Sequence, residues 1–390
     1  MAHVLIAKLL KRQLLGGDSS SEDEEDCPSN FDDDSQADPI VGDTTFHQIM
    51  MYTSIGCAIV TVIVSFFLVW GQMSNYREPR VQKQLIRVIL TAPVFAVLCM
   101  LGVASYRLTH YVEPLAEFYE VFTLVALFLL FIAYLVPSTQ WHTQVAFFSN
   151  PKHGGFKFFK KRYIFVMQVV PGRITTTIAA LAINVMKCRG SGGSSFDAAQ
   201  AIISIVNAVQ LILAISGIFP FLMKQRATLK LTDPQIMGKL ISVKVIVVVQ
   251  IVVHLVLQIL SWTGSLEPTA TLSYNDLNLG LSVFLTTILA MITAFLMVPY
   301  FRPRQFERKP LADLSGTEYG PSHHFEYEED GSIKMGGGSV PADVKPKASR
   351  FRAILDTINI LDVLQGVGRA CKLLGHRNGY SLPSHQNGHS

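Results

Sequence analysis

Seven long apolar segments constrain the fold of this chain more than any other feature. Each is close to the roughly 20 apolar residues that an α-helix needs to cross a bilayer. The chain is 49% hydrophobic and 16% charged, whereas soluble domains carry about 25% charged residues. We therefore expect an all-α integral membrane protein with seven transmembrane helices. The expected spans are residues 49–70, 86–106, 115–136, 163–186, 199–222, 240–260 and 277–300.

Positive charges near the ends of these segments predict their orientation. Lys and Arg concentrate after the first, third, fifth and seventh segments, and the alternate connections are poorer in them. Both residue types favour the cytosolic side of a membrane. The pattern therefore predicts an odd number of spans, with the N-terminus outside or in the lumen and the C-terminus in the cytosol.

The remaining sequence predicts four further regions around the helical domain. Ser19–Asp38 is strongly acidic, which is typical of a disordered tail. Apolar residues recur at helical spacing after a linker rich in Gly, Pro, Ser and charge. They predict an amphipathic cytosolic helix that either lies on the membrane or binds a partner. The expected regions are an acidic disordered tail at 1–48, the transmembrane domain at 49–300, the linker at 301–348, the amphipathic helix at 349–375 and a disordered tail at 376–390.

Arg173 is the charged residue expected deepest in the bilayer. It follows Pro171 and Gly172 in the fourth span, about 15 Å from the start of that span at about 1.5 Å per residue. A kink or break is expected there, because proline lacks the backbone donor that a helix needs. Arg173 either binds a solute or ties helices together through freed carbonyl groups, because lipid offers it no partner.

Other polar residues are expected near the level of Arg173. In the sixth span a spacing of four residues places them on one helix face. Each alone is more simply explained by hydrogen bonds between helices, but together they predict a polar path for a solute. The candidates for this path are Arg173, Asn207, Gln210, Gln250 and His254.

The third span, Leu115–Pro137, carries carboxylates close to its expected outer end. Helix rise places Glu120 about 10 Å above Arg173, so a direct pair requires shifted boundaries or a bent helix. Arg107 or His110 is the easier partner for Glu117 and Glu120. Glu120 is then expected to orient helices or guard the outer entrance of the path.

Several functional classes lack their sequence signatures. The five cysteines and the histidines form no cluster with metal-ligand spacing. The sequence also lacks a P-loop, GxSxG and HExxH. It has no basic stripe with interleaved aromatic residues. We therefore expect no enzyme activity, catalytic residue, metal, cofactor or nucleic acid, and we expect membrane lipids as partners.

Three stretches carry a further pattern. The first reads Asn75-Tyr76-x-x-Pro79-Arg80-x-Gln82-Lys83-Gln84-x-Ile86-Arg87 and leads into Pro93-Val94-Phe95-Ala96. The second reads Tyr119-Glu120-Val121-Phe122, and the third includes Gln168, Arg173, Thr175 and Thr176. They resemble motifs of the organic solute transporter alpha / transmembrane protein 184 family over roughly Phe46–Tyr300. In the third stretch the proline precedes the arginine, unlike the family motif. The residues carried over by position are Arg87, Tyr119, Glu120, Gln168 and Lys244.

This resemblance implies a transport function. Members of the family move bile acids, steroids and other organic anions by facilitated diffusion. It also implies a homo-oligomer or a hetero-oligomer with a small single-span subunit. The order of an acidic tail, seven spans and a long cytosolic tail resembles a fungal branch. We expect a carrier of amphipathic organic solutes or sterol-like or lipid-like anions, in the plasma membrane or an endomembrane such as that of the vacuole.

Two other functions fit the same topology. A trafficking or scaffold protein would recruit partners through the acidic tail and the 349–375 helix. A seven-helix receptor is the third reading. Against it, the third span does not end in an Asp-Arg-Tyr-like triplet, and the seventh contains no Asn-Pro-x-x-Tyr.

Overall fold

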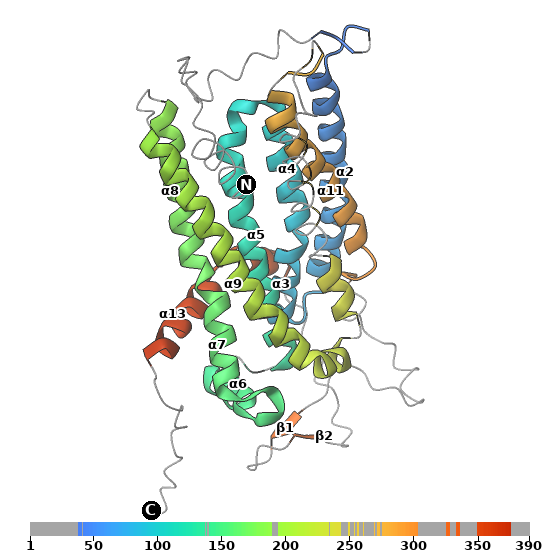
Figure 1. Cartoon of the computed structure of the whole chain (residues 1–390). Helices are drawn as coiled ribbons and strands as arrows, with labels where there is room; N and C mark the ends of the chain where they lie inside the picture. Colours follow the sequence, from blue (N-terminus) through green and yellow to red (C-terminus); the bar gives the residue numbers. More distant parts are fainter. Residues whose placement is uncertain are drawn as a thin grey trace, which may run out of the picture.

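Helices form nearly all of the structure that can be described (Figure 1). Among the described residues, five helical segments are long and apolar enough to cross a membrane. The computed structural model describes residues 38–302 except 41, 137, 139, 189–193, 234, 243–248, 250–252, 254–255, 257–259, 261–268, 270 and 274, and it also describes 325–327, 333–335 and 349–375.

The five segments match the first five expected spans, but most extend beyond the expected bounds. The third and fifth spans are single long helices with an internal proline, α5 (Tyr106–Leu135) and α9 (Ser194–Thr232). The first span is α2 (Phe46–Ser74), which begins with a capping box at Thr45 and Gln48. The second combines α3 (Pro79–Ile89) with α4 (Thr91–Ala104). The fourth combines η3 (Pro151–His153), α7 (Gly155–Met167) and α8 (Val169–Cys188), after the short α6 (Trp141–Ser149).

The expected break in the fourth span lies at Gln168, between α7 and α8. It precedes Pro171 by three residues. The position follows from proline chemistry, because Pro171 cannot donate a hydrogen bond to the carbonyl of Met167 one turn earlier. The chain therefore bends on the N-terminal side of the proline.

The last two expected spans are described less fully. Most of 243–268, which covers the greater part of the sixth span, lies outside the described residues. The seventh corresponds to a short π-helix η4 (Asp276–Gly280) followed by α11 (Leu281–Met297). In Figure 1, α11 runs beside α2 and α4.

Two regions after the last apolar helix differ from the sequence-based expectation. The expected linker contains a two-stranded antiparallel sheet of β1 (Phe325–Tyr327) and β2 (Ile333–Met335). The expected single amphipathic helix is two helices, α12 (Arg350–Ile358) and α13 (Leu361–Gly375). They separate at Asn359, whose backbone is extended and whose side chain accepts a hydrogen bond from the Leu361 N–H. Asn side chains favour such a local bond over a continued helix.

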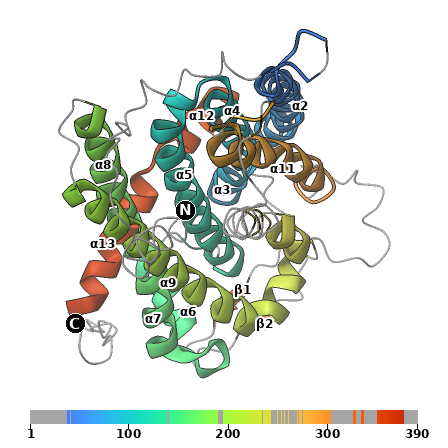
Figure 2. The ribbon, with the colours of Figure 1, turned by 45° about the horizontal axis from the view of Figure 1, so that its top comes forward.

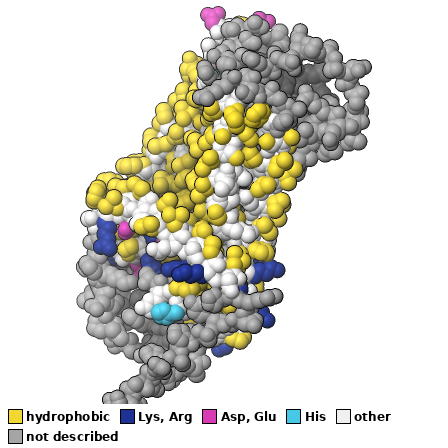
Figure 3. Space-filling view, turned by 90° about the vertical axis from the view of Figure 1, so that its left-hand side faces the viewer, with side chains coloured by type: hydrophobic (Ala, Val, Ile, Leu, Met, Phe, Trp, Pro, Cys, Tyr) yellow, Lys and Arg dark blue, Asp and Glu magenta, His cyan; other side chains and the backbone are white. Residues whose placement is uncertain are grey.

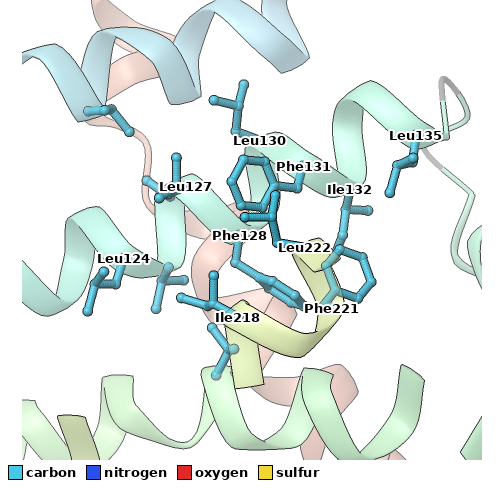
Figure 4. Packing of buried hydrophobic residues seen from close by; sticks show 14 of the residues in the cluster. Leu124, Leu127, Phe128, Leu130, Phe131, Ile132, Leu135, Ile218, Phe221 and Leu222 are labelled. Atoms are coloured by element: carbon cyan, nitrogen blue, oxygen red, sulfur yellow. The ribbon is translucent and has the colours of Figure 1, made fainter. Parts of the chain in front are cut away.

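Aromatic and aliphatic side chains from α5 and α9 form the centre of the largest core (Figure 4). Phe128 and Phe221 approach edge to face, with ring centroids 5.1 Å apart. Phe148 of α6 and Phe159 of α7 stack at 4.3 Å on the same core. Lipid is as apolar as these side chains, so close packing and polar contacts hold such helices together rather than the hydrophobic effect.

Two internal prolines create polar ties between helices. Pro114 in α5 leaves the carbonyl of His110 without its helical donor, and the Asn184 side-chain amide in α8 donates to that oxygen at 2.7 Å. Pro220 in α9 likewise frees the carbonyl of Ser216, which accepts from Arg162 Nη1 in α7 at 2.7 Å. Neighbouring helices commonly satisfy backbone groups that proline exposes in membranes. Each proline therefore fixes a contact partner on another helix.

The outer faces of the helices are apolar. On α2 the side chains of Ile59, Phe66 and Phe67 are 54%, 55% and 68% exposed, and on α9 Ile212 is 66% exposed. In Figure 3 hydrophobic side chains are spread over the middle of the face shown, and Lys and Arg side chains lie in a band toward its lower end. Exposed apolar surface of this extent indicates contact with lipid rather than water. The chain is therefore a multi-pass membrane protein.

Candidate functional site

The candidate site is a polar cluster where α5, α8 and α9 meet in the apolar part of the helix bundle (Figure 2 shows the three helices from a second direction). Arg173 of α8 is 3% exposed, and its Nη1 donates to Glu117 Oε2 of α5 at 2.9 Å. Asn207 of α9 donates to the same carboxylate oxygen at 3.4 Å. The helices thus place one cation, one anion and one amide together.

Three polar atoms of this cluster are buried and have no hydrogen-bond partner among the described residues. They are Arg173 Nε, Asn207 Oδ1 and Gln210 Oε1. Gln210 lies against Gly172, where an added Cβ would be 2.5 Å from its Nε2 atom. Glycine at 172 therefore lets α9 bring an amide close to the backbone of α8. A buried polar atom without a partner costs roughly 1–3 kcal/mol, so these atoms are available to a bound molecule.

The expectation that Arg107 or His110 pairs with Glu117 is wrong, because Glu117 pairs with Arg173. The reason is the start of α5, which begins at Tyr106 rather than near Leu115 and continues through Pro114. Glu117 is therefore about 16 Å along the helix at about 1.5 Å per residue. Glu120 lies one turn further along the same helix, within electrostatic range of Glu117 and Arg173.

Three residues that sequence analysis assigned to the path or to family motifs are not placed. Gln250, His254 and Lys244 lie outside the described residues. Gln168 is placed at the α7–α8 break, where its carbonyl accepts from the Gly172 N–H at 3.4 Å. Its observed contact is thus with the backbone just before Arg173.

Arg87 is the centre of a second polar cluster, which joins α3 to α12 and α13. Its side chain is 1% exposed, and all five of its N–H groups are hydrogen-bonded. Two of these bonds form a bidentate pair with Asp362 of α13, at 2.9 and 3.0 Å. The others reach Gln84 and the carbonyls of Thr357 and Asn359. Every N–H group of the planar guanidinium is therefore hydrogen-bonded. The ammonium group of a lysine could not form the same set of bonds.

Other residues of the Asn75–Arg87 stretch support the same contact. Gln82 accepts from the N–H groups of Arg77 and Glu78, at 2.7 and 2.8 Å, and so fixes the turn that precedes α3. Tyr76 donates to Asp356 of α12 at 3.1 Å. Burial, together with the charge of Asp356, raises the pKa of Tyr76, which keeps the phenol a neutral donor. The stretch thus builds a docking site for the two C-terminal helices.

Asp362 is ionised when α13 is docked. Burial by itself raises the pKa of a carboxyl group, but the hydrogen bonds and charge of Arg87, with those of Lys83, outweigh burial and lower the pKa of Asp362. Lys83 Nζ lies 3.1 Å from the carboxylate, and Gln84 donates to it at 2.6 Å. The carboxylate therefore accepts charge-assisted bonds from several directions.

The Tyr119 and Phe122 side chains connect the Arg87 cluster to α5. Tyr119 donates to the Arg87 carbonyl at 3.1 Å, and the Arg87 guanidinium lies 5.5 Å from the centre of the Phe122 ring. Cation–π contacts of this kind stabilise a partly desolvated arginine. Two residues of the Tyr119–Phe122 stretch thus contact an arginine from the other motif.

Sequence reasoning missed the partners that come from distant segments. Asp362 is 275 residues from Arg87, and nothing in local spacing links them. Lys239 belongs to the basic stretch after the fifth segment, yet it is 1% exposed, forms an ion pair with Asp233 and donates to the Tyr134 hydroxyl at 3.1 Å. Its ion-pair partner is six residues away, so the Asp233–Lys239 spacing was the available signal.

The helical fold, its apolar outer faces and its buried charge cluster define an integral membrane protein with a polar site between its helices. The chain belongs to the family described as "Organic solute transporter Ostalpha", whose sequence model matches residues 50–306. The resemblance inferred from the motifs is therefore confirmed.

One curated relative is similar over a short region. The chain is 36% identical over 72 residues to a protein of Saccharomyces cerevisiae named "Vacuole membrane protein HFL1". The match covers 18% of this chain and 17% of that protein, so the chain spans about a sixth of the relative's length. No solved structure matches the chain.

Proposed function

We propose that this protein is a seven-helix carrier that moves amphipathic organic solutes, including sterol-like or lipid-like anions, by facilitated diffusion. In this proposal residues 240–260 form the sixth span and η4 with α11 forms the seventh. The N-terminus lies outside or in the lumen, and the C-terminus lies in the cytosol. The observation that carries the proposal is the Glu117–Arg173 cluster, in which three buried atoms have no partner within the described part of the chain.

The cluster offers complementary groups to the polar head of an amphiphile. Arg173 Nε is a donor, whereas the side-chain oxygens of Asn207 and Gln210 are acceptors. A hydroxyl or carboxylic acid can satisfy both kinds of group, while an apolar body packs against the surrounding helices. A bound solute would thus supply hydrogen-bond partners for these buried atoms.

Charge limits how an anionic solute binds here. Glu117 already neutralises Arg173, and Glu120 lies within electrostatic range. An anionic head must therefore compete with Glu117 for the guanidinium rather than meet a free cation. Such an exchange favours weak and reversible binding, which a passive carrier needs for release on the far side.

Location and partners form part of the same proposal. We place the carrier in an endomembrane, because the similar yeast protein is named for the vacuole membrane. Membrane lipids surround the helices, and the protein functions without catalysis. Assembly with itself or with a small single-span subunit is expected by analogy with the family.

Flux measurements in vesicles test the assignment. Purified protein is reconstituted, and uptake of a fluorescent bile-acid analogue is compared with that of protein-free vesicles. Arg173→Gln should reduce the protein-dependent rate about tenfold or more, which corresponds to about 1.4 kcal/mol. Arg173→Gln combined with Glu117→Gln removes both charges and controls for the destabilisation that an unpaired, partly buried carboxylate causes.

Thr175→Ala is the matched control. Thr175 is exposed on the same helix, two residues from Arg173, and its hydroxyl bonds only locally to the Gly172 carbonyl at 2.8 Å. It should transport like the unmodified protein. Unchanged flux in a folded Arg173→Gln variant would remove this cluster from the solute path.

A further inference from the structure

A basic cavity lies between the helix bundle and α13, away from the Arg173 cluster. It has a volume of about 180 Å³, and its walls come from α3, α5, α6, α7 and α13. Arg80 and Lys83 line it from α3, Arg369 lines it from α13, and Tyr163 and Gln144 contribute neutral polar groups. Five elements thus converge on one polar space.

Among the residues that the structure describes, the charges around this cavity do not cancel. Lys83 and Arg87 share the single carboxylate of Asp362. The guanidinium groups of Arg80 and Arg369 are close enough to repel each other, and Glu78 is the carboxylate that stabilises Arg80. The sum is four positive and two negative groups, or +2, from Arg80, Lys83, Arg87 and Arg369 against Glu78 and Asp362. An anion bound in the cavity would relieve this repulsion.

The two C-terminal helices, of which α13 lines the cavity, present exposed apolar side chains. Phe351 and Ile358 of α12 are each 69% exposed, and Leu361 of α13 is 56% exposed. Arg369 lies over the ring of Trp141 at 5.2 Å and Arg350 over that of Trp70 at 4.4 Å. Trp and Arg side chains in such contacts are typical of the interface between lipid and water. These features place the cavity at the level of lipid headgroups.

We propose that this cavity binds the phosphate group of an anionic lipid from the leaflet against which α12 and α13 lie. Guanidinium groups from α3 and α13 contact the phosphate oxygens, since arginine forms paired bonds with phosphate. The acyl chains extend along the exposed apolar faces. The lipid thereby bridges the C-terminal helices to the bundle, next to the Arg87–Asp362 pair.

Lipid retention tests the proposal on the full-length protein. Native mass spectrometry measures the fraction of protein that keeps a bound phosphatidylinositol or phosphatidylcholine molecule after release from detergent. The unmodified protein should retain phosphatidylinositol in preference. Arg80→Gln with Arg369→Gln should weaken that retention roughly 25-fold, since each basic residue near a membrane surface contributes about fivefold.

Control variants separate the site from general charge. Lys372→Gln removes an exposed cation of the same helix that does not line the cavity, and it should retain phosphatidylinositol normally. Arg80→Lys with Arg369→Lys keeps the charge but loses the paired guanidinium bonds. Its retention should therefore lie between that of the unmodified protein and Lys372→Gln on one side and complete loss on the other, and it tests the site even if the glutamine variant fails to fold. Retention by the unmodified protein should fall with added salt.

Several results would overturn the proposal. Equal retention of the two lipids would show that the net negative charge of an anionic lipid is not recognised. An equal loss in Lys372→Gln would assign the effect to overall charge. Inorganic phosphate that displaces the lipid at similar concentration would identify a soluble anion as the ligand, which contradicts the lipid source.

Discussion

The contact between Arg87 and Asp362 should hold α12 and α13 against the bundle. Arg87 is 1% exposed and Asp362 is 22% exposed. Removal of one partner from a buried pair costs about 3–5 kcal/mol, because the other charge stays buried and unpaired. Solvent reaches the carboxylate in part and weakens the interaction, so we expect the lower figure, about 3 kcal/mol.

A double-mutant cycle measures this coupling. Arg87→Met and Asp362→Leu should each accelerate backbone hydrogen exchange in α12 and α13, by up to about 100-fold for about 3 kcal/mol. The double variant should be less destabilised than the sum of the single variants by about 2 kcal/mol, because it leaves no unpaired charge. Exchange is measured by mass spectrometry on protein in nanodiscs.

The surface residue Arg352 provides the control for the cycle. Its side chain is 68% exposed, and its Nε is 3.9 Å from Asp356. Arg352→Met should change exchange by less than about 0.5 kcal/mol, as exposed pairs usually do. Strictly additive effects of Arg87→Met and Asp362→Leu would refute the reasoning, because they would show that the two side chains stabilise the helices independently.

Two further predictions concern proline and pH. Asn184→Leu should destabilise the protein by about 1–2 kcal/mol, measured by thermal unfolding in detergent. The cost should be smaller when Pro114→Ala restores the helical donor to the His110 carbonyl. An equal cost in both backgrounds would contradict the proposed role of the Asn184–His110 hydrogen bond. Because the pKa of Asp362 is lowered in the docked state, its contribution to docking is complete above the unfolded-state pKa of about 3.9. It is lost as pH falls through the lower docked value. Hydrogen exchange of α13 should therefore show no Asp362-dependent change between about pH 7 and pH 5, and a change within that window, absent in Asp362→Asn, would contradict the assignment.

Apolar length predicted the first five helical segments well, because about 20 apolar residues have few alternatives to crossing a bilayer. It predicted their ends poorly. The sequence before Leu115 contains Arg107, His110, Glu113 and a proline, which are typical of a connection rather than a helix. The structure continues α5 through this region because Asn184 satisfies the carbonyl that Pro114 exposes.

The error in the predicted start of α5 explains why the partner of Glu117 was predicted wrongly. A start near Leu115 placed Glu117 at the outer edge, where Arg107 or His110 was the nearest partner. A start at Tyr106 places it beside Arg173. Arg173, Asn207 and Gln210 were correctly grouped by their depth, since equal rise per residue brings similar positions of neighbouring spans together. Depth gives no direction around the helix axis, so it could not identify Glu117 as their partner.

The segment Glu117–Phe122 connects the two polar clusters. Glu117 pairs with Arg173, and two residues later Tyr119 bonds to the Arg87 carbonyl. Phe122 lies against the Arg87 guanidinium, which in turn holds Asp362 of α13. The contacts with Arg173 and Arg87 all involve one six-residue part of α5, which is a continuous helix. A continuous helix transmits displacement with little bending. Release of α13 would thus remove a restraint on the same part of α5 that holds the candidate solute site. If the clusters are energetically coupled, Asp362→Leu should change the concentration dependence of vesicle flux without touching Arg173.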